Sequence, residues 1–199
     1  MGRLGILGLA VAIGAGVLAF VLASRSGHSG GYRGSIPPTG ISLPDFTLGA
    51  ATGDTVRSRD LHGKVVIVTF LDTECTQSCP IVADQLARGL ELLQTKDRSR
   101  VAALAVSVLP RADTPARVRT FLRNHRAERQ LLYLIGDERR LRPVWKAFAV
   151  LPAVDTGSAD IHSAGVRVYG PSGEWVSTLR AGVDLTPDNI RHDVLSALR

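Results

Sequence analysis

Residues 65–94 read VVIVTFLDTECTQSCPIVADQLARGLELLQ, and this stretch holds the strongest indication of the fold. Val65 to Leu71 is an unbroken apolar run, which predicts a buried strand. Cys75 and Cys79, the only cysteines of the chain, come shortly after it. Pro80 suits the opening turn of a helix, and apolar residues then recur at helical spacing. We therefore predict a strand, a cysteine-bearing turn and a helix.

Strands and helices alternate over the rest of the chain. The predicted elements are short strands around the turn at 52–54, strands at 101–109 and 131–135, helices beginning at 113 and 138, a hairpin around 170–173, and a closing helix at 187–198. Parallel strand–helix units that end in an antiparallel hairpin indicate a mixed sheet between two layers of helices. The expected fold is a thioredoxin-like α/β/α three-layer domain.

The first 40 residues differ in composition from the rest. Leu4 to Ala23 carries no charge and no proline, and a helix of that length spans about 30 Å, enough to cross a bilayer. Residues 1–23 are therefore expected to be a membrane anchor, with a secretory signal peptide as the alternative. Residues 24–40 are rich in Gly, Ser and Pro and suit a flexible linker. The domain is expected at 41–199, outside the cytoplasm of a cell whose membrane the chain crosses once.

The chain carries a net charge of +6, and many of its arginines lie between Arg111 and Arg142. No aromatic residues alternate with these arginines in the way that a platform for single-stranded nucleic acid requires. We therefore expect no nucleic-acid partner. A solvated helical surface is the favoured interpretation, and a face toward anionic lipid or an acidic partner is the alternative.

The spacing of Cys75 and Cys79 indicates two kinds of chemistry. Two thiols four residues apart in a helical first turn can bind one soft metal ion, or can close a disulfide after a small adjustment. The positive end of the following helix favours thiolate. Among the five histidines, His162 is the candidate partner, because it ends a loop rich in Gly, Ser and Asp and precedes an apolar strand. The alternative is an ordinary loop histidine; His28, His62, His125 and His192 are expected in the linker, in turns or on the surface.

Four blocks of the chain resemble the Sco/SenC family of copper-binding cytochrome oxidase assembly proteins. GKVVIVTFLDTECTQSCPIVADQL at 63–86 is similar to that family's copper-binding segment with its CxxxCP motif. The other blocks are SVLPRADTPARVRTFL at 107–122, LIGDERRLRPVWKAFAV at 134–150 and IHSAGVRVYGPSGEWV at 161–176. Together they extend the resemblance over most of residues 43–199, in the family's order.

The resemblance implies that Cys75, Cys79 and His162 are copper ligands. Thiolates favour Cu(I), and imidazole serves Cu(I) and Cu(II), so the donor set suits the metal. The implied function is an anchored copper metallochaperone whose partner is the copper-accepting subunit of a haem-copper oxidase. The chain departs from the family pattern at Thr76 (often proline), at Leu109 (usually aspartate) and at Ile161 (commonly aspartate).

Two other functions remain open at this point. A thiol-disulfide reductase acting on oxidase cysteines would need the redox pair Cys75 and Cys79 but not His162. A structural disulfide in a membrane-tethered interaction module would close a short loop and would stabilise weakly. Peroxidase activity is disfavoured, because Asp72 occupies the position of the threonine in a TxxC motif.

Overall fold

The computed structural model describes residues 31–156 and 165–199 of the chain. Its strands are β1 (Thr47–Ala50), β2 (Thr55–Arg57), β3 (Val65–Leu71), β4 (Val101–Ser107), β5 (Leu132–Ile135), β6 (Gly165–Tyr169) and β7 (Trp175–Arg180). The helices are η2 (Ser58–Leu61), α2 (Ser78–Glu91), α3 (Thr95–Arg98), α4 (Pro115–Asn124), α5 (Glu138–Ala147), α6 (Ala153–Thr156) and α7 (Pro187–Ala197).

The strands form one mixed sheet in the order β2-β1-β5-β4-β3-β6-β7. Strands β3, β4 and β5 run parallel, while β1 and β6 pair antiparallel to β5 and β3. All seven residues of β3 are buried, as its unbroken apolar run predicts for a central strand covered on both faces. The prediction of a mixed-sheet, thioredoxin-like α/β domain is confirmed.

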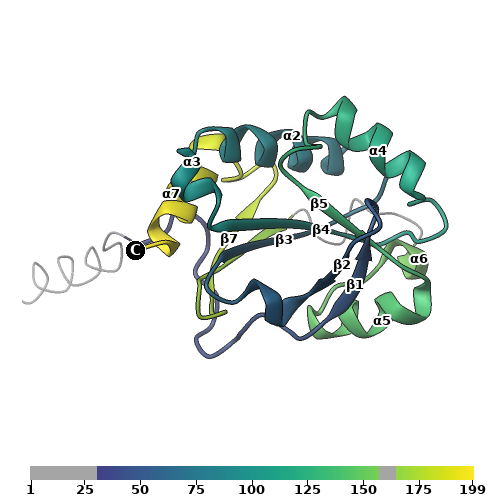
Figure 1. Ribbon diagram of the computed structural model, residues 1–199, viewed down its shortest axis with the longest axis horizontal. Coiled ribbons are helices and arrows are strands. Elements are labelled where there is room, and N and C mark those ends of the chain that lie inside the picture. Colours follow the sequence, from purple (N-terminus) through teal and green to yellow (C-terminus); the bar gives the residue numbers. More distant parts are fainter. Residues whose placement is uncertain (1–30, 157–164) are drawn as a thin grey trace, which may run out of the picture. The chain divides into compact units, whose positions relative to one another are not determined.

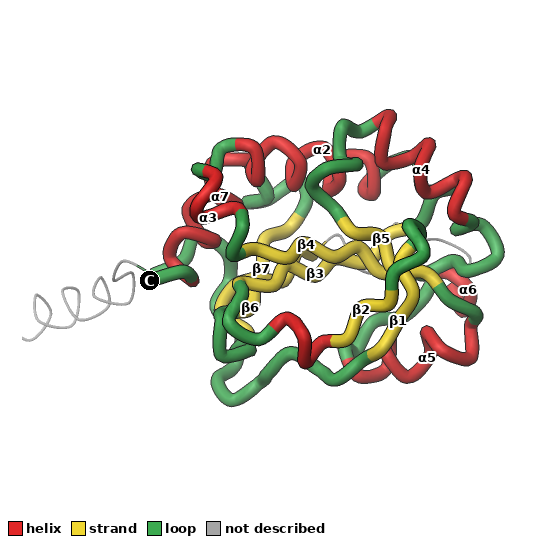
Figure 2. Tube along the Cα trace, viewed as in Figure 1, coloured by secondary structure: helices red, strands yellow, loops and turns green. Residues whose placement is uncertain are grey.

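Helices cover both faces of the sheet (Figures 1 and 2). On one face, α2, α4 and α7 contribute apolar residues to a core around Ile67 and Leu86. On the other face, α5 packs Leu141 and Trp145 against Val68 and Leu104. Successive residues of β3 therefore enter opposite cores, because side chains alternate along a strand. Because β3 and β4 run parallel, their carboxyl ends lie at the same end of the sheet.

The short elements differ most from expectation. The loop predicted before His162 contains the one-turn helix α6, and η2 and α3 are further short helices. Four residues are too few for an apolar repeat to reveal a helix. The long helix after the cysteines begins at Ser78, so Cys79 and Pro80 lie in its first turn while Cys75 precedes it.

The end of the expected linker belongs to the folded domain. The amides of Arg33 and Gly34 donate to the buried Asp193 carboxylate of α7, at 2.7 and 3.0 Å. Ser35 forms a two-bond backbone bridge with Thr178 of β7. Gly34 packs so closely that a Cβ there would lie 2.3 Å from Ser177 Oγ. Polar composition suggested a flexible segment, whereas these contacts hold its last residues against β7 and α7.

The expected membrane helix at residues 4–23 lies outside the described residues. In the part of the chain that the structure describes, no helix has the length and apolar character needed to cross a membrane.

Candidate metal and thiol site

Cys75 and Cys79 lie at the carboxyl end of β3, on the turn that leads into α2. Cys75 is half-buried in this turn and Cys79 is 3% exposed in the first turn of the helix. The amide of Cys79 donates to Cys75 Sγ at 3.2 Å, and Ser78 Oγ lies 3.7 Å from the same sulfur. The two cysteines are not joined by a disulfide. The turn therefore presents Cys75 to the outside and keeps Cys79 behind it.

A buried carboxylate shapes the turn from within. Asp72, the first residue after β3, is 2% exposed. Its Oδ1 accepts hydrogen bonds from the amides of Glu74 and Cys75, at 2.8 and 2.6 Å. These two bonds fold the backbone back on itself and fix the position of Cys75. Asp72, which occupies the threonine position of a TxxC motif, therefore orders the cysteine turn.

A second buried carboxylate holds the turn from the loop between β4 and α4. Asp113 Oδ1 accepts from the amide of Thr73 at 2.8 Å. Its Oδ2 accepts from Ser107 Oγ at 2.5 Å and from the Tyr133 hydroxyl at 3.1 Å. Burial raises the pKa of the Asp113 carboxyl, and the hydrogen bonds from Ser107 and Thr73 oppose this shift. Asp113 therefore ties the cysteine turn to β4 and β5.

The two thiols are electrostatically unequal. A hydrogen bond with the Cys79 side chain lowers the pKa of Cys75 to about 6; burial opposes this shift, and backbone amides add to it. The same hydrogen bond, together with burial, raises the pKa of Cys79. At neutral pH the pair therefore consists of one thiolate and one thiol. Such a pair offers one nucleophile or metal ligand at once and a second after Cys79 loses its proton.

A groove of about 620 Å³ lies beside Cys75. One wall is the cysteine turn with Pro80, and the other is formed by residues of α4 and its end, namely Ala116, Arg117, Thr120, Phe121, Asn124 and His125. His125 was expected to lie on a solvated helix end. It is instead half-buried, with its ring centroid 4.7 Å from that of Phe121. An aromatic residue one helical turn earlier in the sequence could have indicated this packing.

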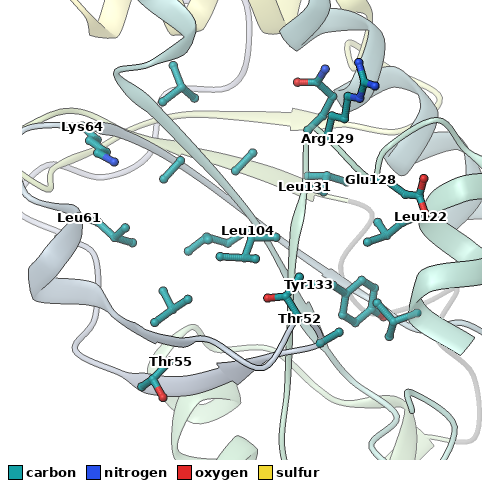
Figure 3. Close-up of a pocket in the computed structure, with 18 of the residues that line it drawn as sticks. Thr52, Thr55, Leu61, Lys64, Leu104, Leu122, Glu128, Arg129, Leu131 and Tyr133 are labelled. Atoms are coloured by element: carbon teal, nitrogen blue, oxygen red, sulfur yellow. The ribbon is translucent and has the colours of Figure 1, made fainter. Parts of the chain in front are cut away.

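A second cavity of about 600 Å³ lies elsewhere on the domain and is lined by neither cysteine. Figure 3 shows Lys64 and Arg129 at its opposite ends with Leu104 between them. It borders the first residues of β4, whereas the cysteine turn follows the last residues of β3. The two hollows are therefore separate features of the domain.

His162, the third predicted ligand, lies outside the described residues, as does Ile161. Within residues 31–156 and 165–199, no three His, Cys, Asp or Glu side chains are grouped so that they could hold a metal ion. The described strand β6 begins at Gly165, whose carbonyl accepts from Thr69 Oγ1 of β3 at 3.4 Å. The structure thus brings Cys75 and Cys79 together, and the position of the predicted histidine remains a prediction.

Sequence reasoning did not identify Asp72 and Asp113 as positioning residues. Asp72 directly follows β3 and Asp113 lies in the loop that follows β4, and loops at the carboxyl ends of parallel strands gather around the functional crevice of an α/β sheet. Their placement after these strands was the sequence feature from which their role could have been predicted. Thr114, rather than Asp113, caps α4, since its side chain accepts from the amide of Arg117.

Comparison with known proteins gives consistent matches. A family model described as SCO1/SenC matches residues 37–199. The SCO2-like protein of Rickettsia felis is 24% identical over 161 residues, which is 78% of this chain and 75% of the relative. The copper-bound structure of Bradyrhizobium japonicum ScoI is 26% identical, with a TM-score of 0.66, over 79% of this chain and all of that one. BsSco, a member of the Sco family of cytochrome c oxidase assembly proteins, is 21% identical with a TM-score of 0.68, over 82% of this chain and 97% of its own.

Proposed function

Because this chain belongs to the SCO1/SenC family, we propose that it binds copper through Cys75, Cys79 and His162. It would deliver this copper to the dinuclear copper site of a cytochrome c oxidase subunit. Residues 4–23 would anchor it in the cell membrane, with the domain outside the cytoplasm. The observation that carries the proposal is the ordered pair of cysteines at the carboxyl end of β3, where the Cys79 amide lies 3.2 Å from Cys75 Sγ.

The route of the chain into β6 supports the assignment of His162. Val68 pairs with Arg167, and Thr69 bonds to Gly165, so β6 starts at the end of the sheet where the cysteine turn begins. Gly165 lies three positions after His162 in the sequence, a reach of at most about 11 Å. An imidazole brought to the thiolate pair would complete three donors that suit Cu(I).

Copper binding by the full chain, purified in detergent, tests this proposal. We expect one Cu(I) per chain, and we expect His162→Ala to weaken Cu(I) binding at least about tenfold in competition with a chromophoric chelator. His62→Ala is the matched control, because His62 lies in the turn before β3, far along that strand from the cysteines. Equal binding by the His162→Ala and His62→Ala variants would remove His162 from the site. Failure of the unmodified chain to bind stoichiometric copper would contradict the function.

The inequality of the two thiols also favours a second candidate function. A low-pKa, half-buried Cys75 beside a protonated Cys79 is the arrangement of an attacking and a resolving thiol. Cys75 would attack a disulfide of the oxidase subunit, and Cys79 would then release the reduced subunit and leave a Cys75–Cys79 disulfide. His162→Ala distinguishes the two functions, since it should leave the rate of disulfide reduction unchanged while it lowers copper affinity.

A further inference from the structure

The segment 115–130, which contains α4, concentrates the charge of the chain. It holds five arginines and one glutamate, a net +4 out of the chain's net +6. Within α4 itself there is no acidic residue to balance Arg117, Arg119 and Arg123. Two-thirds of the net charge therefore lies in a segment of 16 residues.

Most of this charge is not neutralised by the described part of the domain. Arg117 forms an ion pair with Glu74 of the cysteine turn at 2.6 Å. Arg119 and Arg123 are exposed and form no ion pair with residues 31–156 or 165–199. On α5, across the sheet, Arg142 is paired with both Glu138 and Asp155, while Arg139 and Arg140 form no ion pair with the described residues. The α4 surface therefore keeps a positive potential that can attract an anionic surface.

This positive surface borders the groove beside Cys75. Arg117 and Thr120 line the groove, and Arg123 Nη2 donates to Thr120 Oγ1 at 3.4 Å. That hydrogen bond holds the Arg123 guanidinium near the rim of the groove. Arg119 lies one helical turn before Arg123 and lines the separate cavity shown in Figure 3. Arg117 therefore lines the groove, Arg123 bonds to a residue that lines it, and Arg119 lines only the separate cavity.

We propose that α4 is the docking face for an acidic surface of the copper-accepting protein, and that Arg123 guides this surface to the groove at Cys75. The inference rests on the proposed function for the identity of the partner. Complementary charge would speed the encounter and fix its orientation, so that a ligand of the acceptor enters the groove while copper is held by the thiols. An anionic membrane surface is the competing occupant.

Binding between the metal-free full chain and the metal-free oxidase subunit of the same organism tests the proposal. We expect Arg123→Glu to weaken binding about tenfold or more and Arg119→Glu to weaken it less. Arg139→Glu, an equal charge change on the first turn of α5, should alter binding less than about twofold. Added salt should weaken binding of the unmodified chain more than it weakens binding of the Arg123→Glu variant. If Arg123→Glu fails to fold, as judged by circular dichroism, Arg123→Gln replaces it.

Three outcomes would overturn the inference. They are no binding by the unmodified chain, equal effects of the Arg123→Glu and Arg139→Glu changes, and Arg123-dependent binding to phosphatidylglycerol–phosphatidylcholine vesicles without binding to the subunit. Copper transfer from the loaded chain to the same subunit is measured separately. Equal copper transfer with and without Arg123 would support the proposed function and contradict this docking face. Binding that depends on Arg123 without any copper transfer would support the docking face and contradict the delivery function.

Discussion

Two buried carboxylates, Asp113 and Asp193, perform the same structural task in two different regions. Each accepts a hydrogen bond of 2.5 Å from a strand serine, Ser107 or Ser177. Each also accepts backbone amides from a distant segment: Asp113 from Thr73, and Asp193 from the residues at 33–34. One carboxylate holds the cysteine turn and the other holds the N-terminal segment. The comparison shows that each segment is held from the interior by an acid from a distant part of the chain, which in the cysteine turn acts together with the turn's own Asp72.

The largest loss of stability is expected at Asp193, the more deeply buried of the two carboxylates. Asp193→Ala would leave two amides and the Ser177 hydroxyl without their acceptor, at a cost of about 3–5 kcal/mol in unfolding free energy. Urea denaturation would measure this loss, and amide exchange should accelerate at Gly34 and Ser35. The Asp193→Asn variant retains one acceptor and should lose less. A change in Cys75 reactivity without faster exchange at Gly34 would contradict the separation of the two regions.

A smaller loss, about 1–3 kcal/mol, is expected for Asp113→Asn. Burial raises the pKa of Asp113, so the folded state retains a proton that the unfolded state releases as pH rises above the ordinary carboxyl range. The stability of the unmodified chain relative to the Asp113→Asn variant should therefore fall as pH rises from that range. Denaturation at several pH values measures the difference. A difference that grows with pH would show that the hydrogen bonds to Asp113 outweigh its burial.

Thiol reactivity distinguishes the cysteine turn from the N-terminal segment. In the metal-free chain, alkylation at Cys75 should accelerate with pH around a midpoint of about 6. Cys79→Ala removes the hydrogen bond that lowers this pKa, so the thiolate fraction at pH 7 should fall and alkylation should slow about tenfold. Mass spectrometry of the alkylated chain over time gives both rates. An unchanged midpoint in the variant would assign the low pKa to the backbone amides instead.

The smallest change in stability is expected for an ion pair on the surface of the cysteine turn. Glu74 and Arg117 form an ion pair, but both side chains are about half exposed, at 51% and 55%. Glu74→Gln should therefore change the unfolding free energy by less than about 1 kcal/mol, and added salt should reduce even that effect. A larger loss would mean that the exterior ion pair, rather than Asp72 and Asp113, holds the cysteine turn.

Local sequence patterns predicted the central strand and helix of the fold, but they could not predict contacts between residues far apart in the sequence. The apolar run of β3 and the helical spacing of α2 are properties of neighbouring residues, and both elements were predicted close to their observed bounds. The bond from Asp113 to Thr73 joins residues 40 positions apart, and the bond from Asp193 to the Arg33 amide spans 160 positions. No periodicity relates such positions. For this reason the cysteine pair was predicted from the sequence, whereas the carboxylates that position it and the ordered end of the linker were not.

Fixing Gly34 and Ser35 against β7 has a consequence for how far the domain can travel. If the chain leaves the bilayer at residue 23, a free linker to residue 40 could extend to about 60 Å, whereas the nine residues 24–32 before the first held residue reach at most about 32 Å. In a chain anchored as proposed, a shorter free linker would limit how far the domain can move from the membrane. A membrane-embedded acceptor would then meet it at a high local concentration, even when both proteins are scarce.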